Sequence, residues 1–167
     1  MQKRWLLKPK NNAATTRHLR DELGVSDVVA NLLAYRKIET YEGAREFFRP
    51  SLSYLHDPFL MKDMDVAIAR ITQAITNKEK ILVYGDYDVD GTTAVSIVYT
   101  FFHQFHTKLA YYIPDRYAEG YGISYQGIDY AQEHGYTLII ALDCGIKEIE
   151  KVAYAKAKGI DFIIGDH

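Results

Sequence analysis

The sequence predicts an α/β fold with a doubly wound parallel sheet, preceded by a helical N-terminal segment. Four short apolar runs rich in β-branched and aromatic residues support this prediction: ILVY, KLAYYI, TLIIAL and DFIIG, at 81–84, 108–113, 137–142 and 161–165. Runs of this length and composition are typical of strands that are buried on both faces of a sheet. Helical patterns separate the runs, and strands that alternate with helices form parallel sheets with right-handed crossovers.

Residues 1–78 are expected to form the helical segment and residues 79–167 the α/β domain. RHLRDELGVSDVVANLLAYR has apolar residues at helical spacing; Gly24 interrupts the pattern and Ser26 restarts it as a helix N-cap. TYEGAREFF follows as another predicted helix, with Thr40 as its cap.

The last helix of this segment is DMDVAIARITQAITNKEK, which has the pattern of an amphipathic helix. Asp63 or Asp65 lies at its N-terminal end, where the helix dipole favours a negative charge. The residues expected to face inward are Val66, Ala67, Ile68, Ile71, Ala74 and Ile75. In the α/β domain, further helices are predicted over 92–105, about 124–134 and 147–159.

The composition is that of a globular protein with a hydrophobic core. The chain has 167 residues, of which 48% are hydrophobic and 25% charged, and this suits one domain with or without a small appendage. Its single cysteine, Cys144, excludes a disulfide framework and is consistent with a reducing compartment. No apolar run approaches the ~20 residues that span a membrane, and the N-terminus lacks the apolar core of a signal peptide. We therefore expect a cytoplasmic monomer that does not enter the membrane.

Acidic residues follow three of the four predicted strands. They are Asp86, Asp88 and Asp90 after the first strand, Asp143 after the third, and Asp166 with His167 after the fourth. Because ligands bind beyond the carboxyl ends of parallel strands, we expect these side chains to lie together. Oxygen and imidazole donors fit Mn²⁺ or Mg²⁺ best, whereas zinc usually recruits more histidine or cysteine. Several carboxylates can also bridge two ions ~3.5–4 Å apart, an arrangement that activates water in phosphoester hydrolysis.

Groups suited to phosphate lie beside this acidic set. The helix predicted to start near Thr92 presents its positive N-terminal end there, and the hydroxyls of Thr92 and Thr93 are candidate hydrogen-bond donors. The second strand leads into PDRYAEGYGIS, which brings Arg116 and a glycine-rich turn to the same edge. Tyrosines near this edge, among them Tyr121, are candidates for stacking on bases, although packing explains most of them more simply.

Other interpretations of these patterns fit less well. DYDVDG matches the start of a calcium-binding EF-hand loop, but Ile97 occupies the position of the bidentate glutamate. The sequence has neither a P-loop nor the glycine fingerprint of dinucleotide-binding folds. A purely structural aspartate-rich turn would explain one strand end but not three. Cys144 is expected to be a small buried residue, because no histidine is placed to activate it as a nucleophile.

Three sequence motifs resemble those of the DHH phosphoesterase superfamily. YGDYDVDGTTA is similar to its motif I, ALDCGI to its motif II, and GDH to the beginning of its motif III. IPDRYAEGYGIS and DPFLMKDMDVAIARI resemble segments of the single-strand-specific exonucleases in this superfamily. The resemblance covers nearly the whole chain and implies a DHH-type fold. It also implies a 5′-to-3′ exonuclease of DNA recombination and repair, with single-stranded DNA as partner and two Mn²⁺ or Mg²⁺ ions as cofactors.

The resemblance also assigns roles to individual residues. The metal ligands that it implies are Asp88, Asp90, Asp143 and His167, with Asp86 in the same motif. Among them Asp143 would bridge the two ions, and together they would form the catalytic centre. The residues implied to face the nucleic acid are Arg116, Gly120, Tyr121 and Gly122.

The resemblance to the superfamily is incomplete. The second histidine of motif III is absent, as are the later metal-ligating aspartate, the second domain of the catalytic core and an OB-fold. We therefore expect a chain truncated at its C-terminus, with little or no nuclease activity by itself. Two other functions stay open. One is a DHH phosphodiesterase acting on oligoribonucleotides or cyclic dinucleotides, and the other is a non-catalytic DNA-binding or scaffold relative, which would be expected to lose the motif aspartates.

Overall fold

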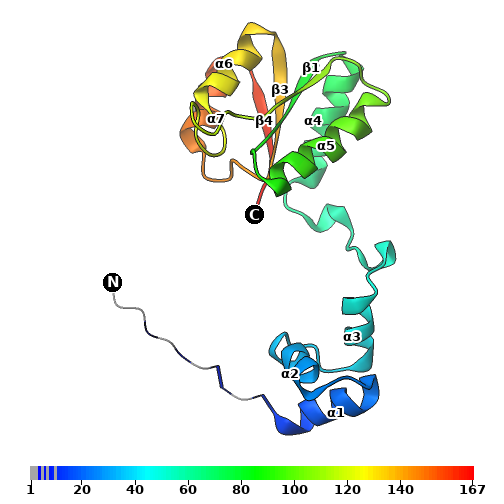
Figure 1. The fold of residues 1–167 in the computed structure, drawn as a ribbon. Helices are drawn as coiled ribbons and strands as arrows, with labels where there is room; N and C mark the ends of the chain where they lie inside the picture. Colours follow the sequence, from blue (N-terminus) through cyan, green and yellow to red (C-terminus); the bar gives the residue numbers. More distant parts are fainter. Residues whose placement is uncertain (1–3, 5, 7, 10) are drawn as a thin grey trace. The chain divides into compact units, whose positions relative to one another are not determined.

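The computed structural model describes residues 4, 6, 8, 9 and 11–167, and Figure 1 shows it as a ribbon. The chain divides into two compact units, Met1–Leu60 and Met61–His167. Each unit has a hydrophobic core of its own. In the part of the chain that the structure describes, no helix is both long enough and apolar enough to cross a membrane.

The first unit consists of short helices around a core of aliphatic side chains. Its elements are α1 (Ala13–Leu23), α2 (Asp27–Tyr35) and α3 (Tyr41–Phe48), followed by the 3-10 turns η1 (Leu52–Tyr54) and η2 (Pro58–Leu60). Its buried core residues are Leu19, Ala30, Leu33, Ala34 and Ala44. The predicted caps are confirmed, because the side chains of Ser26 and Thr40 each accept a backbone hydrogen bond from the first turn of their helix. Gly24 ends α1 in a left-handed conformation, as its position in the pattern predicted.

The second unit contains the predicted parallel sheet. Its strands are β1 (Lys80–Gly85), β2 (Leu109–Tyr112), β3 (Tyr136–Leu142) and β4 (Asp161–Gly165), in the order β2-β1-β3-β4. The chain moves from β1 to β2 on one side and to β3 and β4 on the other, so a topological switch point lies between β1 and β3. Doubly wound sheets bind their ligands at such a point.

Helices cover both faces of the sheet (Figure 1). α4 (Met64–Thr76) and α5 (Val89–His103) lie on one face, and α6 (Tyr125–Glu133) and α7 (Ile149–Ala157) lie on the other. Successive residues of a strand point to opposite faces. Leu82 and Tyr84 therefore pack in the core beneath α6 and α7, while Ile81 packs beneath α4 and α5. The prediction of an α/β fold with strands buried on both faces is confirmed.

α4 packs on the sheet and does not belong to the N-terminal helices. Ala74 is buried, and Ile71 and Ile75 pack with it against the sheet. Val66 and Ile68, which were predicted to face inward, are 62% and 45% exposed. A helical rotation of about 100° per residue places Val66 on the far side of the buried stripe and Ile68 at its margin. The two compact units therefore meet before α4, between Leu60 and Met61, whereas the sequence places the start of the α/β domain at residue 79.

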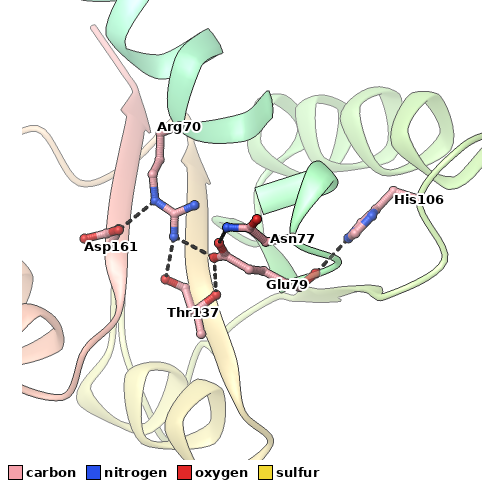
Figure 2. A network of polar contacts seen from close by, with 6 residues as sticks. All are labelled: Arg70, Asn77, Glu79, His106, Thr137 and Asp161. Carbon is pink, nitrogen blue, oxygen red and sulfur yellow. Dashed lines mark hydrogen bonds and ion pairs between the residues drawn. The ribbon is translucent and has the colours of Figure 1, made fainter. Parts of the chain in front are cut away.

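A polar network holds α4 at the amino-terminal edge of the sheet (Figure 2). Arg70 Nε lies 2.7 Å from Asp161 Oδ2 at the start of β4, and Arg70 Nη2 lies 2.8 Å from Glu79 Oε2 just before β1. Glu79 Oε2 also accepts a hydrogen bond of 2.6 Å from Thr137 Oγ1, and the Glu79 carbonyl lies 2.9 Å from His106 Nε2. These contacts fix the starts of three strands, whereas the predicted site lies where the strands end.

Candidate functional site

Three strands deliver an aspartate to the same level of the carboxyl edge of the sheet. Gly85 of β1 pairs in register with Leu142 of β3, and Leu142 pairs with Gly165 of β4. The residues that follow these three positions are Asp86, Asp143 and Asp166. Strands that run parallel and in register therefore set three carboxylates side by side, beginning at the switch point between β1 and β3.

Asp143, Asp166 and His167 form a compact set of candidate metal ligands, which we call the strand-end group. One ligand atom from each lies within 4.8 Å of the others, and His167 Nε2 is 3.6 Å from Asp143 Oδ1. Asp143 has a left-handed backbone conformation with φ 58°, which aspartate tolerates better than most residues. Its N–H donates to the carbonyl of Gly165 over 2.8 Å. This bond holds the Asp143 carboxylate beside the end of β4.

Asp166 is oriented by two backbone donors. Its Oδ2 accepts a hydrogen bond of 2.9 Å from Ile146 N–H, and its Oδ1 accepts one of 2.7 Å from His167 N–H. Each carboxylate oxygen has a second lone pair, so these bonds leave room for a cation. The side chain of His167 is 94% exposed and that of Asp143 only 19%. The strand-end group is therefore open to solvent on its histidine side and enclosed on its sheet side.

Asp86 is fully buried, and it gives the clearest sign of a cation site. Its Oδ1 accepts a hydrogen bond of 3.3 Å from Gly122 N–H. Its Oδ2 is buried and has no hydrogen-bond partner among the described residues. A buried acceptor left unpaired costs about 1–3 kcal/mol, and a charged one costs more. A metal ion would satisfy this oxygen, so the donor set fits a divalent cation on structural grounds.

Asp88 and Asp90 lie at the start of α5, which begins earlier than the predicted residue 92. Asp88 is the N-cap, and its Oδ1 accepts a hydrogen bond of 2.9 Å from Gly91 N–H, while Asp90 lies in the first turn. The prediction started the helix after Gly91, although an aspartate such as Asp88 is a preferred N-cap. Both carboxylates are exposed at the positive end of the helix. They lie outside the strand-end group.

Cys144 lies near carboxylates of the strand-end group and of the motif that follows β1. Burial raises the pKa of its thiol to about 12, and the negative charges of Asp86, Asp166, Asp143 and Asp88 contribute in the same direction. Carboxylates from three strand ends and from the α5 cap therefore all lie near the Cys144 thiol. The thiol is protonated and buried, as expected of a small packing residue and not of a nucleophile.

The loop between β2 and α6 carries the residues predicted to face nucleic acid. The Arg116 guanidinium lies over the ring of Tyr87, 5.3 Å from its centroid, and Tyr87 meets the ring of Tyr121 edge-on at 6.0 Å. Tyr121 is exposed, and desolvation of its hydroxyl, followed by the charges of the nearby aspartates, raises its pKa. The structure thus brings Arg116 and Tyr121 to the acidic edge. Tyr87, which was not among the predicted site residues, stands between Asp86 and Asp88 in the sequence. Its ring contacts both Arg116 and Tyr121.

The glycine-rich turn of this loop is anchored to β1. Gly120 and Gly122 have left-handed conformations, with φ of 86° and 78°. Tyr84 O–H donates to the Gly122 carbonyl over 2.9 Å, so Gly122 is held by Tyr84 on one side and by Asp86 on the other. The Tyr84 hydroxyl also accepts a hydrogen bond of 3.0 Å from Ser124 N–H. No sequence signal marks Tyr84 for this role, because it occupies an ordinary core position of a strand.

The two predicted threonine donors differ in their surroundings. Thr92 Oγ1 donates to the Asp88 carbonyl over 2.6 Å, so its proton is engaged within the first turn of α5. The Asp88 carbonyl therefore competes with a phosphate for this proton, and the contact of Thr92 with a phosphate stays a prediction. Thr93 has an exposed side chain at the same helix end and remains a candidate.

Comparisons with known proteins show the family to which the chain belongs. The family model described as "DHH family, N-terminal domain" matches residues 80–167. The "Single-stranded-DNA-specific exonuclease RecJ" of Bacillus subtilis (strain 168) is 42% identical over 149 residues, which are 89% of this chain and 19% of that protein. The protein of the same name from Haemophilus influenzae is 29% identical over 70% of this chain and 20% of its own length. The chain thus spans about a fifth of the length of these relatives.

Two solved structures have a similar fold. An exonuclease RecJ bound to manganese superposes with a TM-score of 0.59 and 29% identity, over 64% of this chain and 28% of that one. RecJ in complex with Mn²⁺ from Thermus thermophilus superposes with a TM-score of 0.67, over 93% of this chain and 21% of that one. At 24% identity the second likeness concerns the fold alone. Because the family model covers more than half of the residues, the chain belongs to the DHH family.

Proposed function

We propose that this chain is the N-terminal part of the catalytic core of a metal-dependent exonuclease that degrades single-stranded DNA from 5′ to 3′. The observation that carries the proposal is the strand-end group together with the buried, unpartnered oxygen of Asp86 at the same edge. Oxygen and imidazole donors suit Mn²⁺ or Mg²⁺. The relatives support the substrate class and the metal, since they are named single-stranded-DNA-specific exonucleases and a similar solved structure is bound to manganese.

The metal ligands would come from the strand-end group and from the motif after β1. They are Asp86, Asp88, Asp90, Asp143 and His167, and Asp166 joins them on geometry. A divalent cation held there supplies Lewis acidity toward a phosphodiester and lowers the pKa of a bound water. The protein itself fixes the ligands: the cross-strand bond to Gly165 holds Asp143, and the backbone of the β3–α7 loop holds Asp166.

The nucleic acid would lie along the same edge. Arg116 offers a guanidinium for a phosphate, and the exposed ring of Tyr121 offers a face on which a base can stack. Gly120 and Gly122 carry no side chain that would keep a DNA strand away from the protein backbone. Thr93 has an exposed side chain at the positive end of α5, where it can donate to a phosphate. These groups support a nucleic-acid substrate beside the metal ligands.

We expect residues 1–167 alone to have little nuclease activity, because they span about a fifth of the length of the relatives. A single buried and protonated cysteine suits a reducing compartment, which supports a location in the cytoplasm. That the protein acts as a monomer is part of the same proposal.

The test uses the full-length protein that contains this chain, with Mn²⁺, on long single-stranded DNA, duplex DNA and dinucleotides. We expect shortening of the single strand from its 5′ end. Asp143→Asn removes the charge of a proposed metal ligand and should lower this rate by about 100-fold or more. Each tenfold corresponds to about 1.4 kcal/mol of lost transition-state stabilisation. Asp65→Asn, at an exposed position of α4, is the charge-matched control and should keep the full rate. Faster cleavage of dinucleotides, or binding of single strands without cleavage, would contradict the proposal.

A further inference from the structure

Glu119 lies at the centre of a polar network in which its own three hydrogen bonds involve none of the proposed metal ligands. Its Oε1 accepts a hydrogen bond of 2.8 Å from Asp115 N–H. Its Oε2 accepts one of 2.9 Å from Tyr112 O–H and one of 2.5 Å from Ser124 O–H. These donors belong to the end of β2, the beginning of the following loop and the N-cap of α6. One carboxylate therefore ties together both ends of the loop.

Hydrogen bonds to Asp115 stabilise the turn between those two ends of the loop. Asp115 Oδ1 accepts hydrogen bonds of 2.8 Å from both Tyr117 N–H and Ala118 N–H, and Glu119 N–H donates to the Asp115 carbonyl over 2.9 Å. The bonds from the backbone of Ala118 and Tyr117 lower the pKa of Asp115, so this carboxylate stays charged. The side chains of Arg116 and Tyr117 are left on the outside, where both are exposed.

The far end of the loop connects to the motif that follows β1. Ser124 caps α6 by accepting a hydrogen bond of 2.8 Å from Gly127 N–H. Its own N–H donates to the buried hydroxyl of Tyr84, which in turn donates to the Gly122 carbonyl. A continuous series of hydrogen bonds thus runs from Glu119 through Ser124 and Tyr84 to a point two residues before Asp86.

We propose that Glu119 is a positioning residue that holds the loop over residues 114–124 in the conformation that presents Arg116 and Tyr121 to nucleic acid. The proposal rests on the function proposed above and gives Glu119 no contact with the substrate. A loop ordered before binding loses less conformational freedom when the ligand arrives. A carboxylate suits the position because it accepts several hydrogen bonds and donates none, whereas an amide would turn an NH₂ group toward a donor.

Amide hydrogen exchange in the full-length protein without ligands tests the ordering itself. In Glu119→Ala, exchange over residues 115–124 should accelerate by roughly tenfold or more, because hydrogen bonds to a charged group are lost. Exchange in β1 and β3 should stay unchanged. Glu150→Ala, at an exposed glutamate in the first turn of α7, is the matched control and should behave as wild type. Unchanged exchange of the loop in Glu119→Ala would overturn the proposal, whatever the protein binds.

The affinities for a fluorescent single-stranded oligonucleotide and for Mn²⁺ separate positioning from general destabilisation. Glu119→Ala should raise the Kd for the oligonucleotide by roughly tenfold and leave the Kd for Mn²⁺ unchanged. Glu119→Gln, which keeps one acceptor oxygen, should restore part of the affinity. In the Arg116→Ala, Tyr121→Ala background, Glu119→Ala should have little further effect, because the contacts through which it acts are gone.

Equal oligonucleotide affinity in wild type and Glu119→Ala, or a fully additive effect in the double-variant background, would overturn the role of Glu119. A wild-type protein that binds no oligonucleotide would contradict the proposed function instead. The hydrogen exchange of the loop would then still decide whether Glu119 orders it.

Discussion

Gly91 is the residue at which α5 meets the end of β1, and Gly91→Ala is the sharpest test of how the site is packed. A Cβ at this position would lie 2.5 Å from the Asp86 carbonyl oxygen and 2.7 Å from the Asp86 nitrogen. Ordinary contact begins at 3.4 Å, so the start of α5 must move by about 0.9 Å, the difference between 3.4 and 2.5 Å. The atoms in the way belong to the backbone and cannot rotate aside.

Two opposing effects set the magnitude. Overpacking of this kind costs about 1–3 kcal/mol, and exchanging a helical glycine for alanine returns up to about 1 kcal/mol. We therefore expect Gly91→Ala to lower the free energy of unfolding by up to about 2 kcal/mol. The same displacement moves Asp88 and Asp90 relative to Asp86, so the affinity for Mn²⁺ should also fall, by roughly tenfold or more.

Urea unfolding measures the stability, and calorimetric titration measures the affinity for Mn²⁺. Gly43→Ala is the matched control, because its Cβ in α3 would meet Thr40 Oγ1 at 3.3 Å and Ile38 Cγ2 at 3.6 Å. That variant should stay within about 0.5 kcal/mol of wild type. If Gly91→Ala were as stable as wild type and bound Mn²⁺ equally well, the close packing of α5 on the end of β1 would be refuted.

Three further predictions concern polar groups that are buried or partly buried. Tyr84→Phe leaves the Gly122 carbonyl and the Ser124 N–H unpartnered, so urea unfolding should show a loss of about 2–4 kcal/mol; a loss below about 0.5 kcal/mol would contradict these bonds. The hydrogen bond from Thr137, and after it the hydrogen bond and charge of Arg70, lower the pKa of Glu79 below its ordinary 4.5. The Glu79 carboxylate therefore contributes stability above pH 4.5, and this contribution is lost as the pH falls through the pKa of the folded state. Glu79→Gln should therefore flatten the loss of stability between about pH 5 and 3, whereas the exposed control Glu46→Gln should not; identical profiles for Glu79→Gln and wild type would speak against the network. The Cys144 thiol, with a pKa of about 12, should react with a disulfide reagent only after unfolding, and rapid labelling of the native protein would show that it is not buried.

The strands and the acidic edge could be predicted because they depend on local patterns and one topological rule. Apolar runs of strand length identify β1, β3 and β4, and the residue after each of these strands is an aspartate. Parallel strands then bring those aspartates to one edge whatever the details of packing. Motif resemblance added the expected ligand roles, which composition and spacing alone do not assign.

The remaining features depend on contacts between distant residues. The Tyr84 hydroxyl and Ser124 are forty residues apart in the sequence, so no local pattern indicates their hydrogen bond. The inward face of α4 was predicted from hydrophobicity, which cannot tell a side chain packed on the sheet from an exposed valine such as Val66. Glu119 has the appearance of an ordinary loop glutamate until the fold brings Tyr112 and Ser124 to it.

A calorimetric titration of Mn²⁺ into the protein tests the central claim most directly, which is that the carboxylates at the strand ends form a divalent-metal centre. The wild type should bind saturably, and the Asp88→Asn, Asp143→Asn double variant should lose that binding while keeping its fold. Asp65→Asn, with one exposed carboxylate removed from α4, should bind as the wild type does. Equal heats for the wild type and the double variant would contradict the claim and leave the acidic edge as a set of structural turns.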